Sequence, residues 1–150
     1  MRTVIQRVSS ASVTINKIIT KTIAQGLVVF IGVSANDTKK DSKWMADKIL
    51  NLRIFYNDEG KFDKSLLDIK GEILIISQFT LYGDANKGRR PDFTKAAKPD
   101  ISIPLYEGFV NQVKASGLKV ETGEFGADML VDIKNDGPVT IILDSPIKSL

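Results

Sequence analysis

The order of elements along the chain predicts an α/β protein with a mixed sheet and two helices packed on it. Three observations support this. Residues 2–33 are rich in strand-like runs, residues 72–80 contain a buried strand, and residues 38–52 and 102–116 show helical periodicity between such runs. The chain has 150 residues, of which 43% are hydrophobic and 26% charged, so a single domain over residues 1–150 is expected.

The first third of the chain is predicted to form strands. Residues 3–8 open it, and residues 11–15 alternate polar and apolar side chains as a half-buried strand does. A turn at residues 16–17 leads into another strand at residues 18–23. The apolar run at residues 27–31 is typical of a strand that is buried on both faces.

The first helix is predicted at residues 38–52. Residues 36–38, Asn-Asp-Thr, favour the N-cap position of a helix. Met45, Ile49 and Leu52 recur at i, i+4 and i+7, which places them on one helical face. This face is the one expected to pack on the sheet.

The middle of the chain returns to strand and loop. A short strand at residues 53–56 and a hairpin-type turn at residues 57–60 follow the first helix. Residues 73–76 are all apolar, so the strand at residues 72–80 is expected to be buried on both faces. The segment 82–100 contains two glycines and two prolines and is predicted to be a long functional loop.

The second helix is predicted at residues 102–116, because Leu105, Phe109 and Val113 share one face and Gly117 is a typical helix stop. The remaining strands are expected at residues 118–121, 127–134 and 139–144, followed by a short tail at residues 146–150.

The end of the strand at residues 72–80 is the most informative stretch of the chain. Ser77, Gln78 and Thr80 follow the buried apolar residues. An unpaired buried hydroxyl or amide costs about 1–3 kcal/mol, so these side chains need partners in the fold or in a ligand. Because the basic loop at residues 87–91 follows closely, a polyanionic ligand is a candidate.

The composition excludes several kinds of site. The chain has no histidine and no cysteine, so Ser-His-Asp and Cys-His nucleophile systems are impossible, and a zinc site would need carboxylates alone. A hydrolase would take its general base from a carboxylate, a lysine or the substrate. The absence of cysteine fits a cytoplasmic protein. The chain has no run of 18 apolar residues, so no membrane span is expected. The net charge of +3 permits contact with nucleic acid.

Five short segments together resemble one family. They are residues 1–8 (Met-Arg-Thr-Val-Ile-Gln-Arg-Val), 77–81 (Ser-Gln-Phe-Thr-Leu), 88–91 (Gly-Arg-Arg-Pro), 125–129 (Phe-Gly-Ala-Asp-Met) and 135–140 (Asn-Asp-Gly-Pro-Val-Thr). Over nearly its whole length the chain resembles the D-aminoacyl-tRNA deacylases. The resemblance implies a largely antiparallel, barrel-like sheet and a homodimer with the active site at the interface. It also implies hydrolysis of the ester of D-aminoacyl-tRNA, and of mischarged glycyl-tRNA, as chiral proofreading in translation, without metal or cofactor.

Gly137 and Pro138 have two interpretations. The dipeptide alone predicts a turn between two strands, because only about 5–6% of X-Pro bonds in folded proteins are cis. The resemblance implies instead a cis bond whose two carbonyls point into the active site of the partner subunit and exclude L-amino acids. Glycine has no Cβ, so the backbone itself can approach the substrate. The family interpretation makes these residues the determinants of chiral selectivity.

Gln78, Phe79 and Thr80 are the predicted catalytic segment. The resemblance implies that residues 77–80 line the site for the 3′-terminal adenosine and the scissile ester. Backbone N–H groups near Phe79 and Thr80 would form an oxyanion hole. Thr80 is not expected to be the nucleophile, because no histidine is present to deprotonate it. The 2′-OH of the terminal ribose, next to the ester, is expected to activate water instead. For Ser77, bonding to neighbouring backbone is the competing interpretation.

The basic loop is the predicted tRNA contact. Lys87, Arg89 and Arg90, with Lys95 and Lys98 beyond them, place five cations in twelve residues. Charge runs of this kind are often only solvated surface, and that alternative stays open. As a functional segment, the loop would bind phosphates of the acceptor stem independently of sequence.

Three other residues are candidates. Arg7 lies among apolar residues of the first strand, so it either faces solvent on an edge strand or holds the Gly-Pro loop of the partner subunit. Met129 and Phe125 either wall the pocket or pack in the core. Gly83 stands where the family leads us to expect a small residue such as alanine, and its effect on the loop is open.

Two other functions compete with the esterase. A non-catalytic RNA-binding domain would use the basic loop and exposed aromatic residues, although only 7% of the chain is aromatic. A structural dimerisation domain would have no substrate. Hydrolysis of D-aminoacyl-tRNA with the L-form spared distinguishes the esterase from both.

Overall fold

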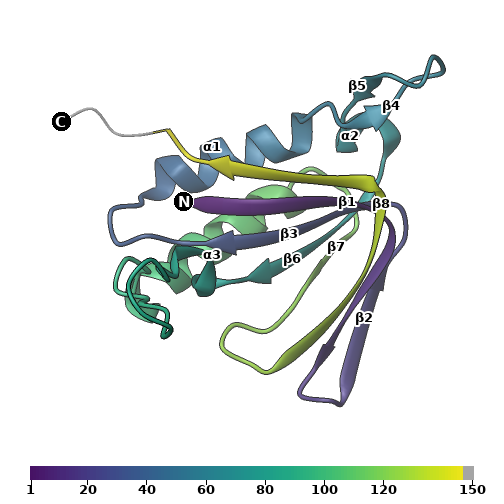
Figure 1. Ribbon diagram of the computed structural model, residues 1–150. Coiled ribbons are helices and arrows are strands. Elements are labelled where there is room, and N and C mark those ends of the chain that lie inside the picture. Colours follow the sequence, from purple (N-terminus) through teal and green to yellow (C-terminus); the bar gives the residue numbers. More distant parts are fainter. Residues whose placement is uncertain (147–150) are drawn as a thin grey trace.

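A six-stranded sheet forms the centre of the molecule (Figure 1). The structure, a computed structural model, describes residues 1–146, so residues 147–150 of the predicted tail lie outside the described part. The strands of the sheet are β1 (Arg2–Ile15), β2 (Ile19–Ile23), β3 (Gly26–Gly32), β6 (Glu72–Ser77), β7 (Val120–Thr122) and β8 (Met129–Asp144).

The long strand β1 organises the sheet. β8 pairs along one edge of β1, from Arg2 to Ile15. β3 and β2 share the other edge, where β3 pairs with residues 2–8 and β2 with residues 11–15. These three pairings are antiparallel, whereas β6 pairs parallel with both β3 and β7. The sheet is therefore mixed, as the sequence predicts.

The sheet curls so that β2 approaches β7. Lys21 Nζ on β2 donates to the carbonyl oxygen of Thr122 at 3.1 Å, and Lys119 Nζ donates to that of Thr22 at 3.2 Å. The curled part of the sheet encloses an apolar cluster that includes Val13. The result is a nearly closed sheet, which agrees with the expected barrel-like shape.

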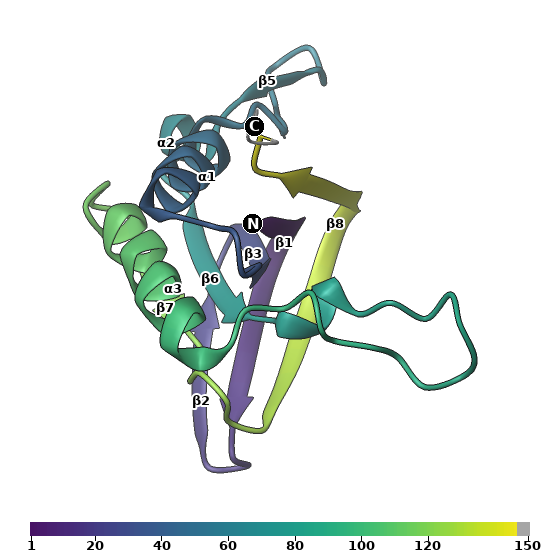
Figure 2. The same ribbon diagram turned by 90° about the vertical axis from the view of Figure 1, so that its left-hand side faces the viewer.

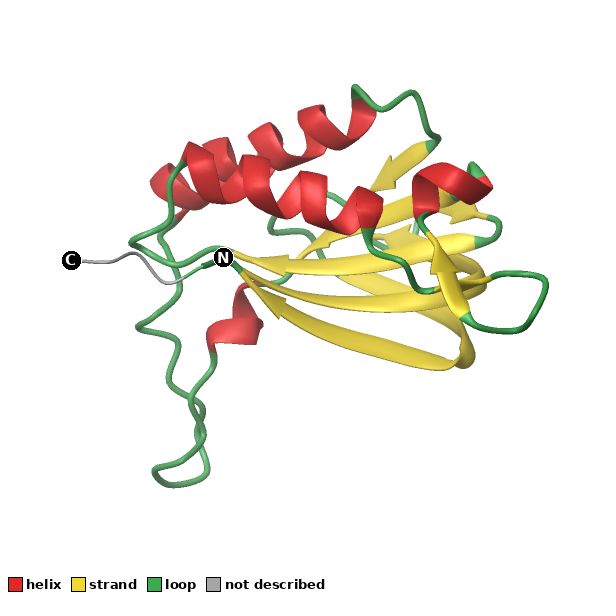
Figure 3. Ribbon diagram, turned by 90° about the horizontal axis from the view of Figure 1, so that it is seen from above, coloured by secondary structure: helices red, strands yellow, loops and turns green. Residues whose placement is uncertain are grey.

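Two long helices cover the other face of the sheet. α1 (Lys39–Asn51) and α3 (Pro99–Lys114) lie beside one another over the strands (Figure 3). Met45 on α1 and Phe109 on α3 are fully buried in the main core with Ile75 of β6. The predicted apolar faces of both helices are thus confirmed, although α3 begins three residues earlier than expected, with Pro99 in its first turn.

Strands β3 and β6 are buried on both faces, as their apolar runs predict. Val29 and Ile75 belong to the core under the helices, whereas Val28 and Leu74 belong to the cluster inside the curl. Alternate residues of each strand therefore serve two different cores, which explains why these runs have no polar alternation.

The sequence predicts two helices, but the described residues form three α-helices. A third α-helix, α2 (Leu66–Ile69), is one turn long and is capped by Ser65, whose hydroxyl accepts from the Asp68 N–H at 3.1 Å. The hairpin β4 (Phe55–Tyr56) and β5 (Phe62–Lys64) precedes α2 and extends from the body of the molecule (Figure 1). A single helical turn has too few residues to produce an apolar periodicity.

Two predicted strand boundaries are also wrong. The strand expected at residues 72–80 ends at Ser77, and the chain turns into a 3₁₀-helix, η1 (Phe79–Tyr82). The two strands expected at residues 127–134 and 139–144 form one strand, β8, which contains an irregularity between them. Among residues 1–146, no helix is both long enough and apolar enough to span a bilayer.

Candidate active site

The first part of the candidate site is the strand end at β6. The Gln78 N–H donates to the Ile31 carbonyl at 2.8 Å, and the Leu81 N–H donates to the Gln78 carbonyl at 3.3 Å. Within residues 1–146, the N–H groups of Phe79 and Thr80 have no hydrogen-bond acceptor, because they occupy the first turn of η1. The strand end therefore presents two adjacent backbone donors that are fixed to the sheet.

The side chains of this segment lie at the surface. Gln78 Nε2 donates to Thr80 Oγ1 at 2.5 Å. The Phe79 ring is 54% exposed and packs edge-on against Phe93, with 5.2 Å between the ring centroids. The hydroxyl of Thr80 is therefore bonded to an amide, which cannot act as a general base.

Arg2 and Tyr82 support the back of the strand end. Arg2 Nη1 donates to the Leu81 carbonyl at 3.3 Å, and the Arg2 guanidinium lies 5.3 Å from the Tyr82 ring centroid. Burial, with the nearby carboxylate of Asp37 as a second cause, raises the pKa of Tyr82 to about 12. Its phenol is thus neutral near pH 7. A hollow of about 440 Å³ opens between Arg2, Tyr82 and the first residues of the following loop.

The basic loop projects far from the sheet (Figure 2). Its base is closed by Asp84 and Asp92, whose backbone N–H and carbonyl groups bond each other reciprocally at 2.8 Å. Lys87, Arg89 and Arg90 are exposed beyond this closure. The three predicted phosphate contacts thus stand at the tip of a protruding hairpin-like loop.

Gly83 joins this loop to the strand end. A Cβ at this position would lie 2.9 Å from the Phe93 ring and 3.0 Å from the Thr80 carbonyl oxygen. The glycine therefore allows the loop to pack closely against η1, which argues against the idea that it loosens the loop.

The second part of the candidate site is the Gly137-Pro138 segment of β8, whose peptide bond is cis. Gln6 pairs with Thr140 and Val8 with Asn135, so Arg7 alone stands opposite residues 136–139, which bulge outward. Gly137 and Pro138 are exposed. This bulge is the irregularity that the sequence predicts as a turn between two strands.

Arg7 holds the bulge. Its side chain is 3% exposed, its Nε donates to the Asp136 carbonyl at 3.1 Å, and its Nη1 donates to the Ile54 carbonyl at 2.9 Å. A Cβ on Gly137 would lie 2.9 Å from Arg7 Nη2. The expectation that Arg7 faces solvent on an edge strand is wrong, because β1 has neighbours on both edges. Arg7 contacts the Gly-Pro segment of its own chain.

The two parts of the site do not meet within this chain. Arg2 of β1 contacts the strand end, whereas Arg7 contacts the Gly-Pro bulge. Five residues of extended strand separate these two arginines by about 17 Å. Figure 1 shows the same separation, because β6 points toward one end of the sheet and β8 bends sharply at the other.

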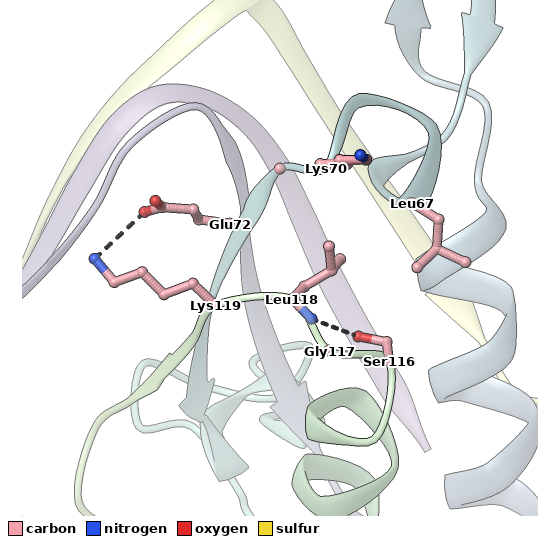
Figure 4. A pocket seen from close by; sticks show the side chains of 8 residues that line it. Leu67, Lys70, Glu72, Ser116, Gly117, Leu118 and Lys119 are labelled. Atoms are coloured by element: carbon pink, nitrogen blue, oxygen red, sulfur yellow. Dashed lines mark hydrogen bonds and ion pairs between the residues drawn. The ribbon is translucent and has the colours of Figure 1, made fainter.

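A further hollow, of about 430 Å³, lies at the opposite end of β6 (Figure 4). Glu72 and Lys119 form an ion pair of 3.5 Å there, and the Leu118 N–H donates to Ser116 Oγ at 3.3 Å. The hollow contains none of the residues predicted for function. In the part of the chain that the structure describes, no group of three or more carboxylates is arranged to hold a metal ion.

Comparisons with known proteins assign the chain to one family. The family model described as D-Tyr-tRNA(Tyr) deacylase matches residues 4–144. The chain belongs to this family. A D-aminoacyl-tRNA deacylase of Clostridium botulinum is 59% identical over 145 residues, which are 97% of each chain. One from Thermosipho africanus is 57% identical over the same shares of the two chains. The curated relatives and the family model identify the family as hydrolases.

Two solved structures share the fold of the family. The structure titled c-Myc DNA Unwinding Element Binding Protein is 43% identical, with a TM-score of 0.90, and covers 98% of this chain and 100% of its own. The structure titled a probable eukaryotic D-amino acid tRNA deacylase is 20% identical, with a TM-score of 0.84 over 95% and 97% of the two chains. The second likeness shows the fold alone.

The family segments differ in what they contact. Met129 packs against the cluster inside the curl and touches Gly123, and the Phe125 ring lies 6.1 Å from that of Tyr106 in the main core. Both therefore make the core contacts that are one of their two interpretations. Sequence reasoning missed two residues. Arg2 is brought to the strand end only by the fold, where it donates to the Leu81 carbonyl. Tyr56 is placed over the Arg7 guanidinium by the structure.

Proposed function

We propose that this protein hydrolyses the ester bond of D-aminoacyl-tRNA and releases the free D-amino acid and tRNA. The observation that carries the proposal is the identity of 54–59% to D-aminoacyl-tRNA deacylases over nearly the whole chain. This match spans both the strand end and the Gly-Pro bulge. The reaction serves chiral proofreading in translation, in the cytoplasm where charged tRNA is used.

Backbone groups, rather than side chains, stabilise the transition state in this proposal. The free N–H groups of Phe79 and Thr80 are adjacent donors for the oxyanion of a tetrahedral intermediate. The described site offers no histidine or thiolate, and Tyr82 is a neutral phenol. In this proposal the 2′-OH of the terminal ribose activates the attacking water, while Gln78 and Ser77 help to position the adenosine end.

The Gly137-Pro138 carbonyls supply the chiral selectivity. The bulge is exposed, and about 17 Å of β1 separates it from the strand end of its own chain. A two-fold homodimer that brings each bulge onto the partner's strand end would complete two identical sites. Carbonyls that face the position of an L side chain exclude it, whereas glycine has no side chain to exclude. Mischarged glycyl-tRNA is accordingly a second substrate.

The basic loop binds the acceptor stem. Lys87, Arg89 and Arg90 extend beyond the Asp84–Asp92 closure, where phosphates can reach them without contacting the sheet. Phosphate contacts position the tRNA without reading its sequence.

The decisive test is hydrolysis of matched D- and L-aminoacyl-tRNA by the purified protein. We expect release of the D-amino acid with the L-ester spared, and sedimentation of the active protein as a dimer. Equal hydrolysis of both esters would contradict the selectivity, and no hydrolysis of either would contradict the enzymatic function.

Nucleic-acid binding without catalysis is the second candidate. It is favoured by the exposed basic loop and by the name of the 43% identical structure, which says that it binds a DNA unwinding element. Tight binding of DNA together with failure to hydrolyse D-aminoacyl-tRNA would support this second function instead.

A further inference from the structure

An exposed pair of aromatic rings covers Arg7. Tyr56 on β4 and Phe62 on β5 stack with 5.3 Å between centroids and 11° between ring planes. The Arg7 guanidinium carbon lies 4.3 Å from the Tyr56 centroid and 5.7 Å from the Phe62 centroid. The rings are 52% and 50% exposed, yet Arg7 beneath them is 3% exposed. The two rings therefore form part of the cover that keeps water from the guanidinium.

Arg7 contacts both the hairpin and the bulge, whose residues Phe55 and Val139 also belong to the same buried core. On the hairpin side, the Ile54 carbonyl accepts from Arg7 Nη1, and the Tyr56 ring covers the guanidinium face. On the other side, the Asp136 carbonyl accepts from Arg7 Nε. A planar guanidinium donates hydrogen bonds in its plane and stacks on its faces. The hydrogen bonds to Ile54 and Asp136 therefore fix Arg7 within its plane, and the Tyr56 ring fixes it perpendicular to that plane.

We propose that Tyr56 and Phe62 are positioning residues that hold Arg7 against the Asp136 carbonyl and thereby set the position of the Gly137-Pro138 segment. The consequence for selectivity rests on the function proposed above. Without the rings, water reaches the guanidinium and competes for its donors, so the Asp136 carbonyl is held less firmly and the bulge keeps only the Asn135 bond to the Val139 N–H. Neither ring contacts the strand end, so the hydrolytic step itself does not depend on them.

The hairpin is braced well enough to act as a support. Asn57 Oδ1 accepts from the N–H groups of Glu59 and Lys61 at 2.9 and 3.1 Å, which closes the turn. Arg53 pairs with Asp63 across the base of the hairpin. The two rings thus project from a turn whose geometry is fixed by its own polar groups.

The test compares a double variant, Tyr56→Leu with Phe62→Leu, with the conservative variant Tyr56→Phe. We expect the double variant to lose about tenfold in the ratio of kcat/KM for D- over L-aminoacyl-tRNA, within the range of a shielded cation–π contact. Its kcat on the D-substrate is expected to remain near the wild-type value. Tyr56→Phe keeps the ring and should keep the wild-type ratio.

Trp44→Leu is the matched control, because Trp44 is a partly buried ring next to Lys48 on α1 that shares no ring contact or hydrogen bond with Arg7 or the bulge in the described part of the chain. It should lower the stability without changing the ratio. If Trp44→Leu lowers the ratio as much as the double variant does, the effect is one of general stability and the proposal is overturned. An unchanged ratio in the double variant also overturns it and leaves the rings as an exposed docking surface.

A second measurement does not depend on activity. In ¹H–¹⁵N spectra, the Nε–H of Arg7 and the amide of Gly137 should both shift, and the Nε–H should exchange faster with water, in the double variant but not in Tyr56→Phe or Trp44→Leu. If the wild type hydrolyses neither ester, the proposed function fails while these signals still decide the positioning role. If the signals stay unchanged, the positioning role fails whatever the activity.

Discussion

The strand end and the Gly-Pro bulge are held in place by different means. Gln78 is bonded through its backbone to Ile31 in the neighbouring buried strand, and the free N–H groups of η1 follow directly. The bulge is held by the buried Arg7 side chain with the rings above it, and by Asn135, whose Oδ1 accepts from the Val139 N–H at 3.1 Å. We therefore expect the strand end, the proposed hydrolytic part, to tolerate changes of side chain, whereas the bulge, the proposed selective part, depends on a few side chains and on one glycine.

The largest expected effect comes from changing the substrate. A D-aminoacyl-tRNA whose 2′-OH is replaced by hydrogen should lose turnover by about 100-fold or more, because the proposed base is lost while both parts of the site stay intact. Single-turnover hydrolysis measures this, and a binding assay with the same tRNA provides the control. Undiminished hydrolysis would show that the protein supplies the base, and the strand end would then depend on its side chains after all.

Gly137→Ala should produce the next largest effect. Gly137 has a φ of +127°, and a Cβ there would lie 2.8 Å from Val139 Cγ2 and 2.9 Å from Arg7 Nη2. We expect a loss of about 1–3 kcal/mol in stability and a lower D/L ratio, because the bulge must move away from Arg7. Denaturant unfolding and paired kinetics on both esters measure the two quantities.

Gly108→Ala is the matched control for this substitution. Apart from its chain neighbours and the backbone of its own helix, no atom of residues 1–146 lies within 4 Å of a Cβ at Gly108, which is in the interior of α3. It should stabilise the protein by about 0.5–1 kcal/mol and leave the ratio unchanged. If Gly137→Ala and Gly108→Ala had the same effect on stability and on the D/L ratio, the bulge would not be closely held and the contrast with the strand end would be wrong.

Charge reversal in the basic loop should have a smaller effect, on tRNA binding, that does not distinguish the strand end from the bulge. Arg89→Glu with Arg90→Glu is expected to raise KM about 3- to 10-fold and to reduce the slope of log KM against log salt by about 1 to 2. The D/L ratio should not change, since the loop contacts neither the bulge nor Arg7 in the described contacts. If KM and the salt slope both stay at wild-type values, the loop is only solvated surface.

The sequence predicts the two parts of the site unequally. The apolar run before Ser77 identifies the buried strand, and the lack of histidine already argues against Thr80 as a nucleophile. The 3₁₀ turn that leaves the N–H groups of Phe79 and Thr80 without acceptors is only four residues long, too short to show a periodic pattern in the sequence. Only the structure therefore reveals these donors. For this part, the sequence predicts the segment, whereas its geometry comes only from the structure.

The bulge shows what pattern reasoning misses. Gly-Pro correctly indicates a break in regular pairing, but the register that places Arg7 opposite the break depends on β1 and β8 meeting across more than a hundred residues. The same holds for Tyr56 and Phe62, which flank a recognisable turn yet acquire a role only because the hairpin folds over Arg7. Burial of the arginine is likewise a consequence of long-range packing, which no local sequence pattern records.

The smallest expected effect is that of Thr80→Ala. The Thr80 side chain is exposed and bonded to the Gln78 amide, and the proposed catalytic group is the backbone N–H, which alanine retains. We expect kcat on D-aminoacyl-tRNA to fall by no more than about threefold, which corresponds to the loss of one modest hydrogen bond. Thr80→Val keeps the side-chain volume and should behave like alanine. If both variants fold and bind tRNA but lose all turnover, the hydroxyl is the nucleophile. The strand end would then depend on one side chain, as the bulge depends on Arg7, and the difference between the two parts would disappear.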